Sequence, residues 1–299
     1  MKYIIPILVI LVVANCGDSK YGEDDLMSDI KGIIDTSGGT VAVAFEDLVT
    51  GRSLFINEKE MMHAASTMKT PVMIEVFKQA EAGTFSIDDS ILVKNEFRSI
   101  VDGSVYSMDF GEDSDDEIYK HLGERLPIRE LVYQMITVSS NLATNILVDL
   151  VDAKNVMETM TSIGAERIQV LRGVEDIKAY RLGMNNTTDA YDMLLVMKAI
   201  ALKQVVTPSA CDAMIGILSE QKFRDKIPAL LPKDVTVAHK TGSITEIDHD
   251  AAIVYPAPHH PYVLVVLTRG IPDHKVAQET IAKISKHIYD FVIDTENGS

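Results

Sequence analysis

The 299-residue sequence contains only two cysteines, Cys16 and Cys211, so a disulfide framework cannot stabilise the fold. Any internal bridge needs Cys16, which ends an apolar N-terminal segment and is lost to bridging if it carries a lipid. Cys211 lies in an apolar stretch with helical spacing, where we expect a small buried hydrophobic side chain. Because 46% of the residues are apolar, we expect the core alone to hold the fold.

Basic residues are scarce relative to acidic ones. Lysine and arginine number 28 against 44 aspartates and glutamates, which gives a formal net charge of −16. A nucleic-acid binder needs a basic surface to displace the counterions of the phosphate backbone, so the composition argues against that class. An acidic run from Gly111 to Glu117 predicts a solvated loop, and we assign it no metal.

The apolar run over residues 3–14 is too short to cross a membrane as a helix. With Lys2 before it, the run has the form of a signal peptide that covers residues 1–16. The small residues before Cys16 resemble a bacterial lipobox, which predicts lipidation of Cys16 and a polar tether over 17–25. Ordinary cleavage after Ala14 is the alternative. Both predict an exported, periplasmic or otherwise extracytoplasmic protein, and the first predicts a membrane-anchored lipoprotein.

Patterns of apolar and turn-forming residues predict the order of helices and strands in the rest of the chain. A helix that starts at Leu26 ends at Gly38, and two strands joined by a turn at Gly51 follow it. A long helical region comes next, before strands and a final helix. The predicted helices cover residues 66–83, 142–151, 188–202 and 208–218, with others at Pro127 and around Ile281; the predicted strands cover 41–45, 52–56, 235–239, 251–255 and 262–268.

The simplest fold for this order is α+β. One antiparallel sheet is built from both ends of the chain and flanked by N- and C-terminal helices, with an all-helical lobe inserted. We assign residues 26–292 to one domain, with an α/β lobe from 26–60 and 222–292 and a helical lobe from 61–221. A cleft between such lobes is a favoured position for an active site. We see no internal repeat and expect a monomer.

Ser66 and Lys69 are three residues apart at the start of a predicted helix, so they share one face. A neutral or partly desolvated lysine amine in that position can take the proton of the serine hydroxyl, which predicts an activated nucleophile. The spacing identifies nothing alone, because Ser28 and Lys31 repeat it on what we expect to be a solvated helix face. Ser66 differs by following the strand pair.

A short polar loop, Ser139 to Asn141, joins two apolar helices. Such a loop places its side chains in a cleft, where a hydroxyl can relay a proton to a leaving nitrogen and an amide can hold a substrate carbonyl. A helix-capping turn is the alternative, since serine and asparagine also cap helices well.

The segment from Lys240 to Ser243 is predicted to end the strand that begins at Val235. Lys240 supplies positive potential, and the hydroxyls of Thr241 and Ser243 can bind a substrate carboxylate. Gly242 leaves room for a substrate backbone to approach. The backbone N–H groups of Ser243 and Ser66 can together form an oxyanion hole. An ordinary turn at the end of a strand is the alternative.

Ser-x-x-Lys, Ser-x-Asn and Lys-Thr-Gly occur here in that order, each in its expected context. In these motifs the chain, over roughly residues 26 to 292, resembles the class A β-lactamases of the serine β-lactamase and penicillin-binding protein superfamily. The resemblance implies that Ser66 is acylated, with Lys69 as its base or proton relay. It implies that Ser139 protonates the β-lactam nitrogen with help from Lys240. No metal or cofactor is implied.

By the same resemblance, Asn141 binds the amide side chain of the substrate, and Thr241 and Ser243 bind its carboxylate. A loop acid that activates the deacylating water is expected at Glu175. The family places an asparagine four residues later, where this chain has Ala179. The family aspartate between the serine and the asparagine of the second motif is replaced by Ser140.

The resemblance implies a serine hydrolase that opens β-lactam rings through a Ser66 acyl-enzyme released by a Glu175-activated water. A peptidoglycan DD-peptidase with the same acylation step is one alternative. A penicillin-binding sensor that stays acylated is another, and Ala179 keeps both open. A purely structural protein requires the three motifs to be coincidences. The structural alternative for Glu175 is a loop-bracing ion pair with Arg172 or Arg181.

Overall fold

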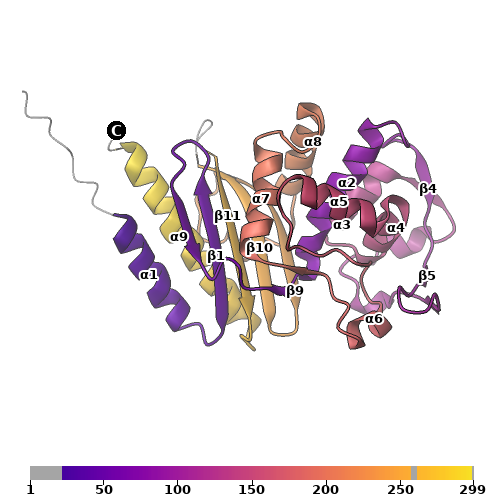
Figure 1. The fold of residues 1–299 in the computed structure, drawn as a ribbon, viewed down its shortest axis with the longest axis horizontal. Coiled ribbons are helices and arrows are strands. Elements are labelled where there is room, and N and C mark those ends of the chain that lie inside the picture. The colour runs from indigo at the N-terminus through magenta and orange to yellow at the C-terminus, as the bar shows by residue number, and fades with distance from the viewer. Residues whose placement is uncertain (1–21, 257–260, 298–299) are drawn as a thin grey trace, which may run out of the picture.

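The computed structural model describes residues 22–256 and 261–297 (Figure 1). The predicted signal peptide, Cys16 and the first part of the expected tether lie outside the described residues. Helix α1 (Glu23–Asp35) begins before Leu26, so the last residues of the expected tether, Glu23 to Asp25, are helical. Their carboxylates occupy the first turn, where the helix dipole favours negative charge.

The central sheet has the strand order β2-β1-β11-β10-β9, and every neighbouring pair is antiparallel. Its strands come from both ends of the chain, as the sequence predicts, and the mixed helix-and-sheet fold is confirmed. Strand β9 forms one edge. The strands are β1 (Thr40–Asp47), β2 (Ser53–Ile56), β9 (Thr236–Ile244), β10 (Ile247–Tyr255) and β11 (Tyr262–Arg269).

The two faces of the sheet are covered by different helices. In β1, Val41 and Val43 belong to the apolar cluster beneath α1 and α9 (His274–Asn297), whereas Ala42 and Ala44 belong to the cluster beneath the other helices. This alternation is the period of two that a strand covered on both faces requires. Figure 1 shows the sheet between the α1–α9 pair and the helical part of the molecule.

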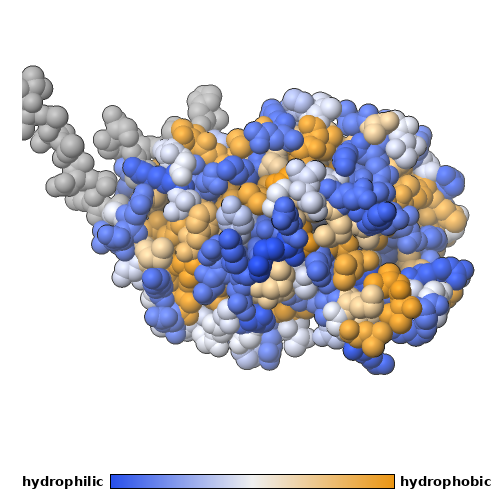
Figure 2. Space-filling model, viewed as in Figure 1, coloured by the Kyte–Doolittle hydropathy of each residue, from blue (hydrophilic) through white to orange (hydrophobic). Residues whose placement is uncertain are grey.

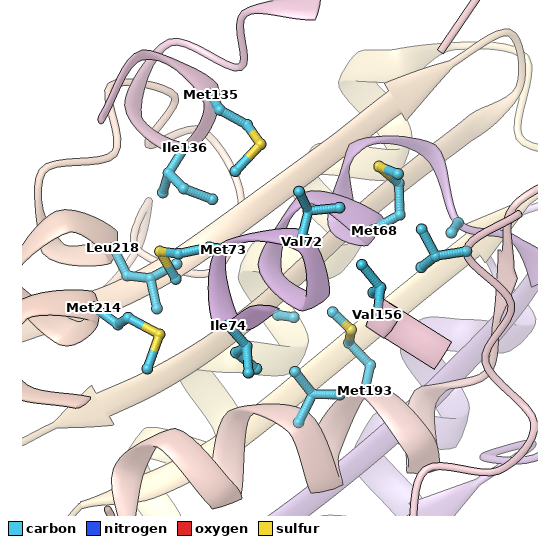
Figure 3. Packing of buried hydrophobic residues seen from close by; sticks show 14 of the residues in the cluster. Met68, Val72, Met73, Ile74, Met135, Ile136, Val156, Met193, Met214 and Leu218 are labelled. Carbon is cyan, nitrogen blue, oxygen red and sulfur yellow. The ribbon is translucent and has the colours of Figure 1, made fainter. Parts of the chain in front are cut away.

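Helix α2 (Lys69–Glu81) runs through the middle of the helical part. Its residues Val72, Met73 and Ile74 are fully buried, and Figure 3 shows them surrounded by side chains of neighbouring helices. The surrounding helices are α3 (Ile128–Thr137), α4 (Asn141–Val151), α5 (Ala153–Ser162), α7 (Ala190–Ala201) and α8 (Pro208–Ser219). Helix α7 also packs on β1, β10 and β11, so the helical core continues into one face of the sheet.

Helices α5 and α6 (Ile177–Arg181) were not expected from the sequence. Helix α6 is too short to show a helical repeat of apolar residues. Ile177 in this helix and Leu182 directly after it are exposed, and Figure 2 shows an apolar patch in this part of the surface. Three short antiparallel pairs complete the fold: β3 (Met62–His63) with β8 (Thr187–Thr188), β4 (Ser90–Leu92) with β7 (Arg125–Pro127), and β5 (Phe97–Arg98) with β6 (Val105–Tyr106).

Over residues 22–256 and 261–297, no helix has both the length and the apolar character needed to cross a membrane. The same residues contain no cluster of three or more His, Cys, Asp or Glu side chains suited to a metal ion. Cys211 is a buried free thiol on α8, the environment expected from the sequence.

Candidate active site

Ser66 lies in a short 3-10 helix, Ala65–Met68, that leads directly into α2. Its neighbour Ala65 has a φ of 45°, in the left-handed region that non-glycine residues avoid. The backbone N–H of Ala65 donates to Nδ1 of His63 at 3.0 Å, which helps to hold this turn. Lys69 follows as the first residue of α2, and its N–H bonds to the carbonyl of Ser66.

The amine of Lys69 is fully buried and makes three hydrogen bonds to the loop between α3 and α4. Its Nζ donates to the carbonyl oxygen of Ser139 at 2.7 Å, to Oγ of Ser139 at 3.1 Å and to Oδ1 of Asn141 at 2.8 Å. Burial lowers the pKa of Lys69 to about 7, against the opposing charges of Asp113 and Glu175. Near neutral pH the amine is therefore present in both forms. The ammonium form can donate all three bonds, whereas the neutral form donates two and keeps a lone pair that can accept a proton, as a general base requires.

Ser139 lies between two lysines. Its Oγ accepts from Nζ of Lys69 and from Nζ of Lys240, both at 3.1 Å. Burial lowers the pKa of Lys240 well below its usual value, and the charge of Lys69 lowers it further. Because a hydroxyl has two acceptor lone pairs and one proton, these contacts leave the proton of Ser139 free to donate into the pocket. Ser139 itself has a φ of 60°, a strained conformation that aims this loop.

The segment from Lys240 to Ser243 lies within β9, which continues to Ile244. The segment thus lies at the end of the strand, as expected, but the strand is longer than the predicted 235–239, because the ladder with β10 continues through the segment and pairs Gly242 with His249. A side chain at Gly242 would place its Cβ 3.0 Å from both the backbone nitrogen of Ser66 and the Cβ of Ala65. Glycine thus allows the close approach of the edge strand to the nucleophile turn, which any side chain would force apart by a few tenths of an ångström.

Lys226 is a buried site residue that the sequence reasoning missed. Its Nζ donates to the carbonyl of Gly242 at 3.0 Å and to Oγ of Ser243 at 2.7 Å, and it pairs with Asp248 at 2.9 Å. Lys226 lies in an irregular segment without a motif, so the sequence carries no signal for it. It brings a further buried positive charge beside Ser243.

Glu175 reaches the same site from the loop before α6. Its Oε1 accepts from Nδ2 of Asn141 at 3.1 Å, and its Oε2 accepts from the backbone nitrogen of Asp109 at 3.1 Å. Burial raises the pKa of this carboxyl above its usual value. Its φ of 60° shows that the backbone is held in a left-handed conformation to present the side chain.

Arg172, offered above as an ion-pair partner for Glu175, makes other contacts. Its guanidinium donates to the carbonyls of Met184 and Gly173 and to Oδ1 of Asn185. Asn186 also braces this loop, because its side chain bonds to both the backbone N–H and the carbonyl of Arg172. These hydrogen-bond partners are uncharged, so Arg172 holds the loop that carries Glu175 through carbonyl and amide oxygens.

Ala179, at the position of the expected asparagine, is fully buried in α6. Its backbone N–H donates to the carboxylate of Asp176, which caps the helix. The site therefore holds no amide side chain at this position.

The acidic run from Gly111 to Glu117 is not simply a solvated loop, which corrects the expectation from sequence. Asp115 is buried, and burial raises its pKa. The carboxylate of Asp113 accepts hydrogen bonds from the backbone nitrogens of Asn141 and Leu142. Two carboxylates of the run, those of Asp113 and Asp115, thus contact the loop between α3 and α4 and the start of α4. Composition does not reveal such long-range contacts.

These side chains surround a pocket of about 330 Å³. It is lined by Ser66, Glu112, Ser114, Ser139, Asn141, Phe223, Asp225, Lys226, Thr241, Ser243 and Gln278. The structure thus brings the predicted residues of all three motifs to one place and joins Glu175 to them through Asn141. The lining of the pocket supplies a hydroxyl nucleophile, a relay hydroxyl and a cationic end. The amine of Lys69, with its lowered pKa, and the carboxyl of Glu175, with its raised pKa, lie behind this lining and contact it through Ser139 and Asn141.

The chain is similar to known proteins in sequence pattern and in fold. A family model described as the beta-lactamase enzyme family matches residues 25–292. The beta-lactamase of Sphaerobacter thermophilus is similar in structure, with a TM-score of 0.75 at 23% identity, covering 89% of this chain and 96% of that one. PBP-A has a TM-score of 0.76 at 24% identity, covering 89% and 95%. A beta-lactamase from Chitinophaga pinensis has a TM-score of 0.77 at 22% identity, covering 89% and 99%.

At these identities the structural likeness establishes the fold, and the fold is shared by beta-lactamases and a PBP alike. No curated protein sequence matches the chain. The chemistry must therefore be argued from the residues of this pocket.

Proposed function

The chain belongs to the beta-lactamase enzyme family, and on that premise we propose that it hydrolyses β-lactams through an acyl-enzyme on Ser66. The observation that carries the proposal is the paired contact of Lys69 and Lys240 with Oγ of Ser139, beside the nucleophile turn. This arrangement supplies a base for the attacking hydroxyl and an acid for the leaving nitrogen in one connected network.

Substrate orientation follows from the charges of the pocket. Thr241 and Ser243 present hydroxyls at the end where Lys226 and Lys240 are buried. A carboxylate of the substrate is attracted to this end because the surrounding low dielectric strengthens its interaction with the lysines. The amide side chain of the substrate then lies toward Asn141, on the opposite wall.

In the proposed acylation, neutral Lys69 takes the proton of Ser66 as Oγ attacks the β-lactam carbonyl carbon. The negative charge on the carbonyl oxygen is stabilised by the backbone N–H groups of Ser66 and Ser243. Ser139 gives its proton to the ring nitrogen as the C–N bond breaks, and Lys69 passes the proton it took from Ser66 on to Ser139. The product is an ester of Ser66 with an opened ring.

In the proposed deacylation, Glu175 takes a proton from a water as its oxygen attacks the ester carbonyl carbon. That proton is returned to Oγ of Ser66 as the ester C–O bond breaks. The raised pKa of Glu175 suits a general base that works near neutral pH. The contact with Asn141 supports this role because it directs the carboxylate toward the substrate side of the pocket. The net reaction consumes one water and opens one amide bond.

A second candidate function is acylation without rapid release, as in a penicillin-binding protein or a DD-peptidase. Ala179 favours it, because no side-chain amide helps Glu175 to hold the water at that position. A PBP-A variant with this fold has been captured as an acyl-enzyme with penicillin G. The two candidates share Ser66, Lys69 and Ser139 and differ in the fate of the ester.

The test follows colour and protein mass together when purified protein is mixed with a chromogenic cephalosporin. Many turnovers that vanish in Ser66→Ala support the proposal. A single burst with a stable adduct supports the second candidate, and absence of both adduct and turnover rejects both. Ser28→Ala is the matched control, because Ser28 has the same spacing to Lys31 on the exposed side of α1. That variant should behave as wild type.

We also propose that the protein is exported and anchored through a lipid on Cys16, which the sequence motif supports. Expression of the full chain in a bacterial host should place it in the membrane fraction, and Cys16→Ser should release it. Equal fractionation of both proteins would contradict the anchor. The proposed assembly in solution is a monomer, which light scattering of the released protein would test.

A further inference from the structure

The segment between β6 and α3 folds against the start of α4 by way of one carboxylate. Asp113 accepts from the backbone nitrogen of Asn141 at 2.9 and 3.1 Å and from that of Leu142 at 2.9 Å. It also accepts from the hydroxyl of Tyr119 at 3.0 Å. Three donors therefore converge on a single side chain that comes from a distant part of the sequence.

These contacts complete the cap of α4. The first turn of any helix leaves N–H groups without intrahelical partners, and a carboxylate there gains both hydrogen bonds and the helix dipole. Ser140 is the N-cap residue, and its hydroxyl oxygen accepts from the N–H of Ala143. Asp113 satisfies the two preceding amides, those of Asn141 and Leu142.

The capped residue is the one that connects the two halves of the reaction. Asn141 is the first residue of α4, and its side chain accepts from Lys69 and donates to Glu175. A carboxylate that fixes the backbone of Asn141 therefore fixes the distance from Lys69 to Glu175. A shift of about 1 Å in such a network is enough to lower a rate by roughly two orders of magnitude.

The same segment makes further contacts with the site. The hydroxyl of Ser114 donates to the carbonyl of Ser139 at 3.2 Å, the oxygen that also accepts from Lys69. The backbone nitrogen of Asp109 donates to Glu175. Residues 109–114 therefore brace the acylating loop and the deacylating acid together.

We propose that Asp113 is a positioning residue of this active site, which holds Asn141 between Lys69 and Glu175 and supplies from outside the motif the carboxylate that Ser140 lacks. This inference rests on the proposed function. Asp113 acts through its hydrogen bonds to the backbone of Asn141 and through the electrostatic effect of its charge on Lys69. It does not line the substrate pocket.

The electrostatic consequence is specific. The charged groups that face Lys69 are Asp113, Glu175 and Lys240, and the two carboxylates raise its pKa against the effect of burial. Replacement of Asp113 by asparagine removes one favourable charge, so the pKa of Lys69 falls. The acid limb of the acylation rate then moves to lower pH, whereas a loss of packing alone lowers the rate without moving the limb.

The experiment compares Asp113→Asn with Asp116→Asn, which removes an exposed carboxylate from the same segment. Acylation by a chromogenic cephalosporin is measured by quenched-reaction mass spectrometry across pH. We expect Asp113→Asn to acylate about tenfold more slowly at its plateau, because the network is displaced. We expect its acid limb to lie roughly one pH unit lower, the shift typical of a lost neighbouring charge. Asp116→Asn should match wild type.

Asp113→Glu serves as the conservative variant and should return the limb toward its wild-type pH, because it restores the charge. The proposal would be overturned if Asp113→Asn and Asp116→Asn had the same plateau acylation rate and the same midpoint pH of the acid limb. A slower plateau with an unmoved limb would also overturn it, since that is the result of a merely structural role. Circular dichroism of each variant identifies any loss of fold.

A second readout does not depend on the reaction. NMR titration of lysines labelled at Cε, with Lys69→Arg to assign the signal, gives the midpoint of Lys69 directly. If the wild-type protein forms no adduct, the proposed function fails. The titration midpoint of Lys69 in Asp113→Asn, compared with that in wild type, still decides this inference. An unchanged midpoint overturns it, and a lowered midpoint supports it.

Discussion

The side-chain amide of Asn141 donates to the carboxylate of Glu175 across 3.1 Å, while its oxygen accepts from Lys69 at 2.8 Å. One amide therefore links the base assigned to acylation with the base assigned to deacylation. The link is directional, because an amide has distinct donor and acceptor ends. Substitutions at Lys69 and at Glu175 should therefore affect acylation and deacylation separately.

Glu175→Ala is expected to acylate at close to the wild-type rate and to accumulate the acyl-enzyme. Loss of a general base lowers the affected step by about 10² to 10⁴-fold, and here that step is release of the ester. Mass spectrometry during turnover of a chromogenic cephalosporin checks both halves of the prediction. Turnover of this variant at the wild-type rate would remove Glu175 from the mechanism.

The acylation rate of the wild-type protein should rise with pH through a midpoint near the pKa of Lys69, which burial lowers to about 7. The sign follows from the proposed role: below that pH the amine is protonated and cannot accept the proton of Ser66, and above it the neutral amine can. Single-turnover rates between about pH 5 and 9 measure the midpoint. A rate that is flat across this range would exclude Lys69 as the base.

Much of this site is predictable from sequence because its motifs are local. Ser66 and Lys69 share a helix turn, and the residues from Lys240 to Ser243 share one strand, so spacing places the members of each set together, although Ser28 and Lys31 show that it does not identify the nucleophile. The sheet is also predictable, since apolar runs and turn residues mark its strands. Spacing does not tell whether the three motifs lie together in the folded protein. The contacts of Ser139 with Lys69 and Lys240 show that they do.

The remaining features depend on contacts between segments far apart in the chain. Asp113 and Lys226 carry no motif, and each gains its role only from a backbone that the fold brings to it. The left-handed conformations of Ala65, Ser139 and Glu175 are equally invisible in the sequence, because alanine, serine and glutamate do not favour them. Packing imposes these conformations, and local propensity has no part in them.

Gly242→Ala is expected to slow acylation while leaving the fold intact. The added Cβ lies 3.0 Å from the nitrogen of Ser66, so β9 or the nucleophile turn must shift by a few tenths of an ångström. We expect a decrease of about ten- to a hundredfold in kcat/KM, since one oxyanion donor is displaced. Steady-state kinetics and the thermal midpoint check rate and fold together.

Gly216→Ala is the matched control, because Gly216 lies within α8 and an added Cβ there meets no atom within 4 Å. Alanine in a helix interior is favoured over glycine by roughly 0.5–1 kcal/mol, so this variant should be slightly more stable and fully active. An equal loss of kcat/KM in both variants would contradict the close approach of Gly242 to Ser66.

Lys226→Met should destabilise the protein by about 3 kcal/mol or more, because it leaves the buried carboxylate of Asp248 without the lysine. Asp248 keeps its contacts with Nδ1 of His274 and with the hydroxyl of Ser243, but loses the lysine buried beside it. Adding Asp248→Asn should recover part of the loss, since it removes the unpaired charge itself.

Denaturant unfolding of the single and double variants measures the coupling between Lys226 and Asp248. The exposed Lys31→Met serves as the control and is expected within about 0.5 kcal/mol of wild type. Additive losses in the double variant would show that Lys226 and Asp248 do not stabilise each other, and would leave Lys226 as a charge held solely by Ser243 and backbone carbonyls.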